Sequence, residues 1–198
     1  MLVRKAREED VAPVARLLLE SAPVIYERFA GGSERALATL EVAFAETGNV
    51  ASREVVRVAE LDGRVAAAMA AFPLAEGTER SRAFLRLTLK RVPVWRWWRT
   101  LRLFSGGAAT TATREDSLYI DALATDPGMR RRGAARALLD EAEREALERG
   151  LAAVTLDTTL DNDVARALYA GAGFDEVAYR APTRVLPGFV ALVKRVDR

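Results

Sequence analysis

The stretch TDPGMRRRGAARALLDEAE, from Thr125 to Glu143, decides the fold. Three arginines stand directly before a glycine and two alanines, at the point where a helical pattern begins. The run before them, SLYIDALAT, is strand-like, and the periodic pattern after them predicts a helix over 133–149. A strand, a short loop and a helix that begins with small residues suit a phosphate, because the free N–H groups of the first helical turn favour an anion.

Small residues at this helix start let the backbone approach a bulky pyrophosphate, and the arginines add positive charge at the rim. The candidate phosphate-binding residues are Arg130, Arg131, Arg132, Gly133, Ala134 and Ala135. Other phosphate loops fit less well, since G-x-x-x-x-G-K-[ST] is absent and Ala135 and Arg136 break the dinucleotide pattern G-x-G-x-x-G. By itself, RRRGAA is equally compatible with a solvated basic helix start.

The composition is that of a folded protein with a balanced charge. The chain has 198 residues, of which 50% are hydrophobic and 29% charged, and its net charge is only +2. Histidine and cysteine are absent, which excludes disulfides, Ser-His-Asp and Cys-His nucleophiles and the usual zinc sites, so we expect no metal. The start MLVRKAREED is charged at once and no apolar run reaches transmembrane length. We therefore expect a cytoplasmic protein.

Helix and strand patterns alternate along the chain. Strands are predicted over 2–5, 117–125, 152–159, 174–180 and 188–195, and helices over 8–20, 33–47, 133–149 and 164–172. Ser33 is the expected N-cap of the second helix. The run from Glu54 to Phe72 predicts a hairpin that turns at Asp62-Gly63. The sum is one α/β (α+β) domain over 1–198, with a mixed, mostly antiparallel central sheet flanked by helices and a central β-α-β crossover.

Two segments, LYIDALATDPGMRRRGAARALL and DNDVARALYAGAGF, together resemble the GNAT superfamily of N-acetyltransferases. The first is similar to that family's pyrophosphate motif R/Q-x-x-G-x-G/A at Arg130, Gly133 and Ala135, where alanine replaces the commoner glycine. The second is similar to the signature N-x-x-A-x-x-L-Y-x-x-x-G-F, with matches at Asn162, Ala165, Leu168, Tyr169, Gly173 and Phe174. The resemblance is specific over about 117–180 and looser over 1–75 and at the C-terminus.

The resemblance implies that the strands 117–125 and 152–159 splay apart to hold acetyl-CoA as cosubstrate. The pantetheine arm would pair with the backbone of Leu123, Ala124 and Thr125, the amides of 131–135 would hold the pyrophosphate, and Asn162 would join the coenzyme site. It also implies direct transfer of an acetyl group to an unidentified primary amine of a small molecule or peptide. A non-catalytic acyl-CoA-binding or sensor domain on the same fold is the alternative.

Acetyl transfer to an amine needs a proton acceptor for the amine and benefits from a proton donor for the leaving thiolate. Tyr169 matches the family tyrosine near the coenzyme sulfur and is the candidate general acid, although helical spacing alone would make it a core residue. Asp121 is the first candidate base, because aspartate is disfavoured inside a strand and should face a polar cleft. Asp157 is the second candidate. A water-relayed base and structural pairing with arginine stay open.

An insert over about 80–116 lies where the family usually has a short connection. Arginine and tryptophan interleave from Arg82 to Phe104, a pattern that also occurs in nucleic-acid and membrane-surface segments. Because the net charge is near zero, we expect neither nucleic acid nor membrane as a partner. We expect instead that the tryptophans pack on the acceptor cleft or on a partner subunit, which allows a homodimer.

Overall fold

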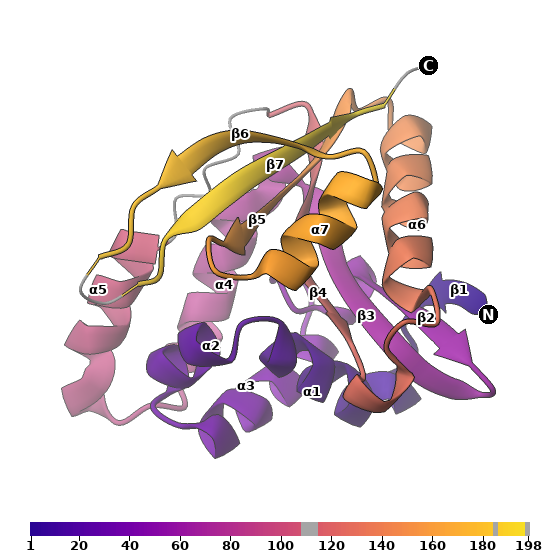
Figure 1. Ribbon diagram of the computed structural model, residues 1–198. Coiled ribbons are helices and arrows are strands. Elements are labelled where there is room, and N and C mark those ends of the chain that lie inside the picture. The colour runs from indigo at the N-terminus through magenta and orange to yellow at the C-terminus, as the bar shows by residue number, and fades with distance from the viewer. Residues whose placement is uncertain (108–114, 184–185, 197–198) are drawn as a thin grey trace.

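A seven-stranded sheet forms the centre of the computed structural model, which describes residues 1–107, 115–183 and 186–196 (Figure 1). The strands are β1 (Leu2–Lys5), β2 (Val56–Leu61), β3 (Arg64–Pro73), β4 (Ser117–Thr125), β5 (Ala153–Thr159), β6 (Asp175–Arg180) and β7 (Phe189–Arg195). Their order is β1-β2-β3-β4-β5-β7-β6, and only the pair β4–β5 is parallel among the described strands. The predicted mixed, mostly antiparallel sheet is confirmed.

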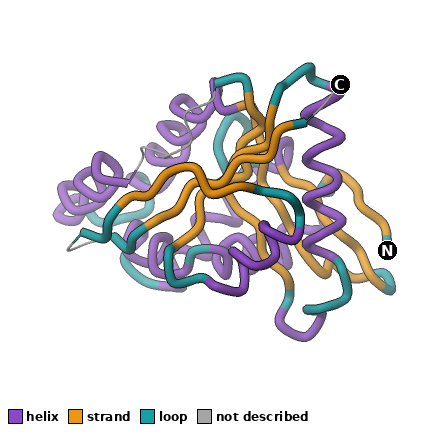
Figure 2. Tube along the Cα trace, turned by 45° about the horizontal axis from the view of Figure 1, so that its top comes forward, coloured by secondary structure: helices purple, strands orange, loops and turns teal. Residues whose placement is uncertain are grey.

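Helices cover both faces of this sheet (Figure 2). They are α1 (Val11–Ser21), α2 (Pro23–Ala30), α3 (Ser33–Ala45), α4 (Gly77–Leu89), α5 (Trp97–Gly107), α6 (Ala134–Glu148) and α7 (Asp163–Gly171). One face carries α6 and α7, and the other carries α1, α3 and α4, with α2 and α5 packed outside them. The helix α6 makes the crossover between the parallel strands β4 and β5, as predicted.

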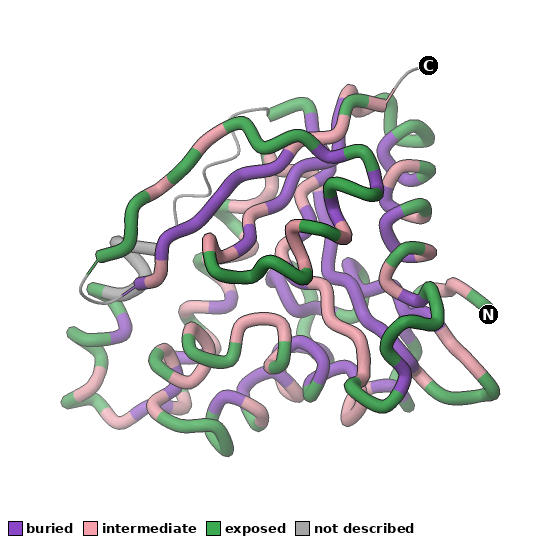
Figure 3. Tube along the Cα trace, in the orientation of Figure 1, coloured by how far each residue is buried: buried purple, intermediate pink, exposed green. Residues whose placement is uncertain are grey.

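The core consists of two apolar layers, one on each face of the sheet. Along β3, Ala67, Met69 and Ala71 belong to the layer beneath α6, whereas Ala68 and Ala70 belong to the layer beneath α1 and α3. Successive residues of a strand point to opposite faces, so a continuous apolar run predicts a strand that is buried on both sides. The strand β6 lies at the sheet edge and is the most exposed of the C-terminal strands (Figure 3).

The hairpin turn between β2 and β3 is confirmed where Asp62-Gly63 predicted it. Both residues have left-handed backbone angles, with φ of 51° and 74°. A two-residue turn of this kind twists in the same sense as its strands, and glycine and aspartate are among the few residues that tolerate these angles. The turn sets the register of β2 against β3 and so places the hairpin beside the loop that follows β4.

Two local features differ from the sequence prediction. The helix α2 was not predicted, although Pro23 at its start and Gly31 just past its end are the usual signals for a short helix. Ser33 is the first residue of α3 rather than its N-cap, and its side chain makes no capping hydrogen bond. Gly32 stands in the cap position with φ of 139°, an angle open mainly to glycine.

The insert forms two helices, α4 and α5, over most of its length. The Thr100 hydroxyl donates to the carbonyl of Phe29 at 3.1 Å and so fixes α5 on α2. Trp95 and Trp98 are 76% and 62% exposed, so they do not pack on an acceptor cleft of this chain, and packing on a partner subunit stays a prediction. Residues 108–114 of the insert lie outside the described residues. Within the described chain, no helix has the length and apolar character needed to cross a bilayer.

Candidate active site

A gap opens between the two parallel strands at the centre of the sheet. The strands β4 and β5 pair from Ser117 and Ala153 to Ile120 and Leu156, and the pairing stops there. Beyond that point β4 stays paired only to β3 and β5 only to β7. The backbone of residues 121–125 therefore turns an edge toward β5 that has no strand partner there among the described residues. Leu123, Ala124 and Thr125, the predicted pantetheine-binding residues, lie on this edge.

A β-bulge falls at Asp121, where the gap begins. Ala71 pairs with Ile120 and the preceding Ala70 pairs with Ala122, which leaves Asp121 as the extra residue of β4. Residues two apart normally share a face of the sheet, but Ile120 packs in the layer beneath α6 and Ala122 in the layer beneath α1 and α3. The bulge thus changes which residues face which side, a known means of re-aiming a side chain.

The carboxyl group of Asp121 is held away from water although the residue is only partly buried. Burial raises the pKa of Asp121 to about 7, and the nearby Asp157 carboxylate contributes to the shift. Burial also raises the pKa of Tyr26 on α2, with a smaller contribution from the Asp121 charge. Asp121 therefore lies toward the α1–α2 side of the sheet and can exchange a proton near neutral pH.

Asp157, the second candidate base, lies on β5 across the gap. It accepts a hydrogen bond at 3.2 Å from the hydroxyl of Tyr119, which lies on β4. Asp157 lies near enough to Asp121 for its negative charge to raise the pKa of the Asp121 carboxyl group. The structure thus brings both predicted carboxylates together, and it adds two phenols, Tyr26 and Tyr119, that sequence reasoning did not identify. The sequence marks neither phenol: Tyr26 lies on the unpredicted helix α2, and Tyr119 precedes Asp121 by two residues.

The loop after β4 has the form of an anion cradle. Asp126 accepts from the amide of Gly128 at 2.8 Å and begins a short turn over Pro127–Met129. Arg131 and Gly133 both have left-handed angles, with φ of 61° and 83°. Among the described residues, no hydrogen-bond acceptor takes the amides from 131 to 136. Unpaired amides at a helix start in such a loop favour a phosphate group.

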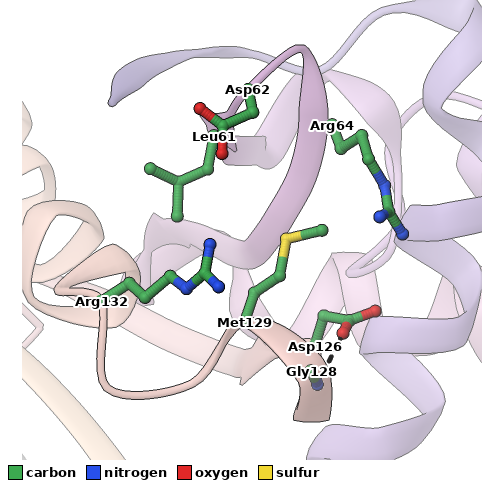
Figure 4. A pocket seen from close by; sticks show the side chains of 7 residues that line it. All are labelled: Leu61, Asp62, Arg64, Asp126, Gly128, Met129 and Arg132. Atoms are coloured by element: carbon green, nitrogen blue, oxygen red, sulfur yellow. Dashed lines mark hydrogen bonds between the residues drawn. The ribbon is translucent and has the colours of Figure 1, made fainter.

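The arginines of the loop differ in what they contact. Arg130 lies at the fixed motif position, and its guanidinium donates to Glu20 on α1 at 3.1 Å and to the Thr125 carbonyl at 3.4 Å. Arg131 is exposed. Arg132 is also exposed, and it points into a pocket of about 190 Å³ beside the β2–β3 turn (Figure 4). That pocket is not lined by Asp121 or by the unpaired edge of β4 at residues 121–125.

Tyr169 lies on α7, which sits in front of the sheet between β5 and α6 (Figure 1). The side chain is 7% exposed, and its ring contacts that of Phe174 with centroids 5.9 Å apart. Burial raises the pKa of Tyr169 to about 12, so the phenol keeps its proton at neutral pH. Among the described residues no acceptor takes that proton in a hydrogen bond, which leaves the hydroxyl available to a bound molecule.

Asn162 starts α7 and caps it. Its side-chain oxygen accepts from the amide of Ala165 at 3.2 Å. This oxygen therefore has a structural partner, while the amide nitrogen of the same side chain can still donate. The cap fixes the start of the helix that carries Tyr169. Within the described residues, no three metal-ligating side chains are grouped together.

Ionisable groups lie near the gap and in the layers that pack on each face of the sheet. Asp121 and Asp157 supply carboxylates, with Asp121 toward α2, and Tyr169 supplies a protonated phenol from the layer beneath α6 and α7. The free edge of β4 and the unpaired amides of the following loop connect them. The arrangement can bind an extended molecule that ends in phosphate groups and can exchange protons at its other end.

Comparisons with known proteins agree with this fold. The model of the acetyltransferase (GNAT) family matches residues 23–174. A solved acetyltransferase is 25% identical with a TM-score of 0.76, and each chain is covered completely. An N-acetyltransferase from Staphylococcus aureus Mu50 is 18% identical over 98% of this chain and 100% of its own, with a TM-score of 0.72. The ribosomal-protein-S18-alanine N-acetyltransferase from Escherichia coli is 19% identical over 100% and 94%, with a TM-score of 0.56. No curated protein matches the chain.

Proposed function

Because the chain belongs to the acetyltransferase (GNAT) family, we propose that it moves the acetyl group of acetyl-CoA directly to a primary amine of a small molecule or a peptide. The observation that carries this proposal is the gap between β4 and β5, which begins at Asp121, a carboxyl group whose pKa is raised to about 7. The protonated phenol of Tyr169 in the layer beneath α6 supports it. A coenzyme-binding domain without chemistry would have no need of a matched pair of this kind.

The coenzyme is assigned to the free edge of β4 and to the loop after it. The amides of 131–136 would hold the pyrophosphate, and the backbone of Leu123, Ala124 and Thr125 would pair with the pantetheine arm. Small residues at 133–135 let the phosphates come close to the backbone. Arg130 forms an exposed ion pair with Glu20. Its guanidinium would have to leave Glu20 before it could bind a phosphate, and an exposed pair of this kind costs little to break.

Asp121 is assigned as the base. An amine has a reference pKa of about 10.4 and arrives mostly as an ammonium ion, which must lose a proton before its nitrogen can attack. A carboxyl group with a pKa near 7 is ionised in a large fraction of molecules at neutral pH and is a stronger base than an exposed carboxylate. The neighbouring Asp157 carboxylate would favour the approach of a cation.

Tyr169 is assigned as the acid. The amine nitrogen forms a bond to the acetyl carbon, the bond from that carbon to sulfur breaks, and the departing thiolate takes a proton. Tyr169 holds its proton to about pH 12 and can supply it to the sulfur. The products are the acetylated amine and free CoA. The nitrogen loses two protons in all: Asp121 takes the first and passes it to water, and the second leaves the nitrogen as the C–S bond breaks and restores the proton that Tyr169 gave to the sulfur.

The test is a panel of amines incubated with acetyl-CoA while free thiol is measured. We expect thiol release with at least one small-molecule or peptide amine, at a rate that exceeds hydrolysis. Calorimetry with acetyl-CoA alone measures binding independently. Tight coenzyme binding without transfer to any amine would favour the alternative, an acyl-CoA-binding sensor domain on this fold.

A further inference from the structure

The positive charge of this protein is concentrated in the insert. Between Glu79 and Glu115 the sequence has nine basic residues and no acidic residue. The rest of the chain then holds 21 of the 30 basic and all 28 acidic residues, a net charge of −7. The net charge of +2 is therefore the sum of a basic segment and an otherwise acidic chain. The expectation that no anionic surface is a partner was based on the net charge alone.

Large apolar side chains are exposed on the same segment. Val94 and Trp95 are 70% and 76% exposed, Trp98 is 62% exposed, and Leu101 is 45% exposed. Arg99 lies over the Trp98 ring at 6.0 Å from its centroid, and Arg102 is exposed one turn further along α5. We call these six residues the Trp–Arg patch: Val94, Trp95, Trp98, Arg99, Leu101 and Arg102. An exposed apolar group rimmed by charge marks an interaction surface.

The patch is held in place by the opposite side of α5. Thr100 is 2% exposed and bonds to the carbonyl of Phe29 on α2. Trp97 donates from its indole nitrogen to the carbonyl of Leu89 at 3.1 Å. By helical spacing Trp98 and Arg102 point away from Thr100, Leu101 lies on one side of them, and Arg99 lies on the other. The exposure of the tryptophans is thus a consequence of how α5 docks rather than of an unpacked end.

The chemistry of the patch favours one kind of partner. A symmetric dimer through this face would bring Arg99 of one copy toward the same basic patch of the other, and none of the six patch residues is acidic. Nucleic-acid bases would stack on the tryptophans, but they would not bury the aliphatic side chains of Val94 and Leu101 in an apolar environment. Basic side chains flanking tryptophan and aliphatic residues on a surface helix are typical of binding in the headgroup region of an anionic bilayer.

We propose that the Trp–Arg patch docks this protein on an anionic lipid surface. Trp95 and Trp98 enter the headgroup region, and Arg99 and Arg102 meet lipid phosphates. The patch lies at the end of the molecule opposite α6, so docking leaves the phosphate loop at the start of α6 open to solvent (Figure 1).

The test uses full-length protein and two kinds of vesicle, one of phosphatidylcholine and one of equimolar phosphatidylcholine and phosphatidylglycerol. We expect flotation with the anionic vesicles only, a weaker association as salt is added, and a blue shift of tryptophan emission on binding. The variant Leu101→Ser with Arg102→Glu should lose affinity for the anionic vesicles by about tenfold or more, since it removes apolar area and reverses a charge.

The matched control is Leu147→Ser with Arg144→Glu on α6, where the leucine is 43% exposed and the arginine side chain 60%. This control should bind vesicles as the wild type does, and thermal melting of both variants checks that each is folded. The proposal is overturned if both variants lose the same affinity for anionic vesicles, or if the wild type does not float with these vesicles. Patch-dependent binding of single-stranded RNA without vesicle binding, or a patch-dependent dimer in sedimentation, also overturns it.

Discussion

At the scale of single residues, Asp121 combines two properties that strands usually avoid. It is an aspartate inside a central strand, and its carboxyl group is kept from water, which raises its pKa to about 7. The bulge in β4 explains how the strand accommodates it, because the extra residue is free of the normal alternation. The proposed base is therefore expected to lower the stability of the fold, so measurements of both activity and stability against pH test the role of Asp121.

Replacing Asp121 with asparagine should lower kcat/KM mainly at neutral pH, by roughly a hundredfold, because the amide cannot accept the proton of the ammonium. Activity should recover in part at high pH, where free amine becomes abundant. The pH profile of kcat/KM for the two enzymes measures this, with Asp157→Asn as the comparison. A loss by the same factor at every pH would make Asp121 a positioning residue instead.

The same substitution should change how stability depends on pH. Burial raises the pKa of Asp121 to about 7 in the folded protein, whereas in the unfolded chain the carboxyl group has its ordinary pKa of 3.8. Folding therefore takes up a proton within this window, and stability falls as the pH rises through it. The variant lacks this penalty, so its melting temperature should exceed that of the wild type by several degrees at about pH 8, with a smaller difference near pH 5. Parallel melting curves would contradict the assignment.

Tyr169→Phe keeps the buried ring and its contact with Phe174 but removes the proton donor. The kcat should fall by roughly ten- to a thousandfold while coenzyme affinity persists, because the proposed role of the hydroxyl is to protonate the leaving thiolate and not to bind the coenzyme. Steady-state kinetics and calorimetry separate the two quantities. A wild-type kcat in this variant would assign the thiolate's proton to water.

At the scale of elements, the loop between β4 and α6 can be tested as a unit. Gly133→Val should abolish the rise in melting temperature that acetyl-CoA produces by mass action, because a branched side chain would occupy the space near the amides. A Cβ atom added at Gly133 would lie 4.0 Å from the Met1 side chain and would meet no nearer atom of the described residues. Any strain that valine causes in the protein without coenzyme therefore comes from the φ of 83°, which side chains rarely adopt.

Gly150 provides the matched control for that experiment. It lies just past the other end of α6, has φ of 68°, and has no atom within 4 Å of an added Cβ. Gly150→Val therefore introduces similar backbone strain away from the loop and should keep the shift with acetyl-CoA. A retained shift in Gly133→Val, or a loss in both variants, would exclude the loop as the pyrophosphate site.

Most elements could be predicted from local patterns, and the exceptions have physical reasons. The hairpin at Asp62-Gly63 and the helix α6 were predicted because turn chemistry and apolar spacing act within a few residues. The short helix α2 was missed because its inward face is small: only Ala30 is fully buried, and Tyr26 is partly buried against the core. The exposure of Trp95 and Trp98 depends on how α5 docks on α2, a contact between distant segments.

The candidate site was predicted less completely. Motif resemblance indicated the loop after β4 and Tyr169, and the rarity of aspartate in strands indicated Asp121. Tyr26 and Tyr119 were not found, because their relation to the carboxylates arises only when α2 and β4 come together in space. The bulge at Asp121 likewise depends on the register of β4 against β3, which no pattern within β4 alone predicts.

At the scale of the whole molecule, one buried ion pair joins the sheet to α6, the helix that begins at the phosphate loop. Arg57 on β2 and Glu145 on α6 are 2.9 Å apart, and each side chain is only 8% exposed. Glu145 also pairs with Arg149 at 2.7 Å, which balances part of its charge. The pair lies near the end of α6 opposite the loop, so it fixes the orientation of the helix without touching the site.

Removing one partner leaves a buried charge uncompensated, so Glu145→Leu alone should cost about 3–5 kcal/mol of unfolding free energy. Replacing both, as Arg57→Met with Glu145→Leu, should restore most of that loss, because two apolar side chains need no pairing in the layer beneath α6. Denaturant unfolding of the single and double variants measures the difference. The acetyl-CoA shift should persist in the double variant, since the loop amides are unchanged. If the double variant is as unstable as the single one, the pair is worth more than the apolar contacts that replace it, and α6 is held to the sheet by electrostatics rather than by its apolar face.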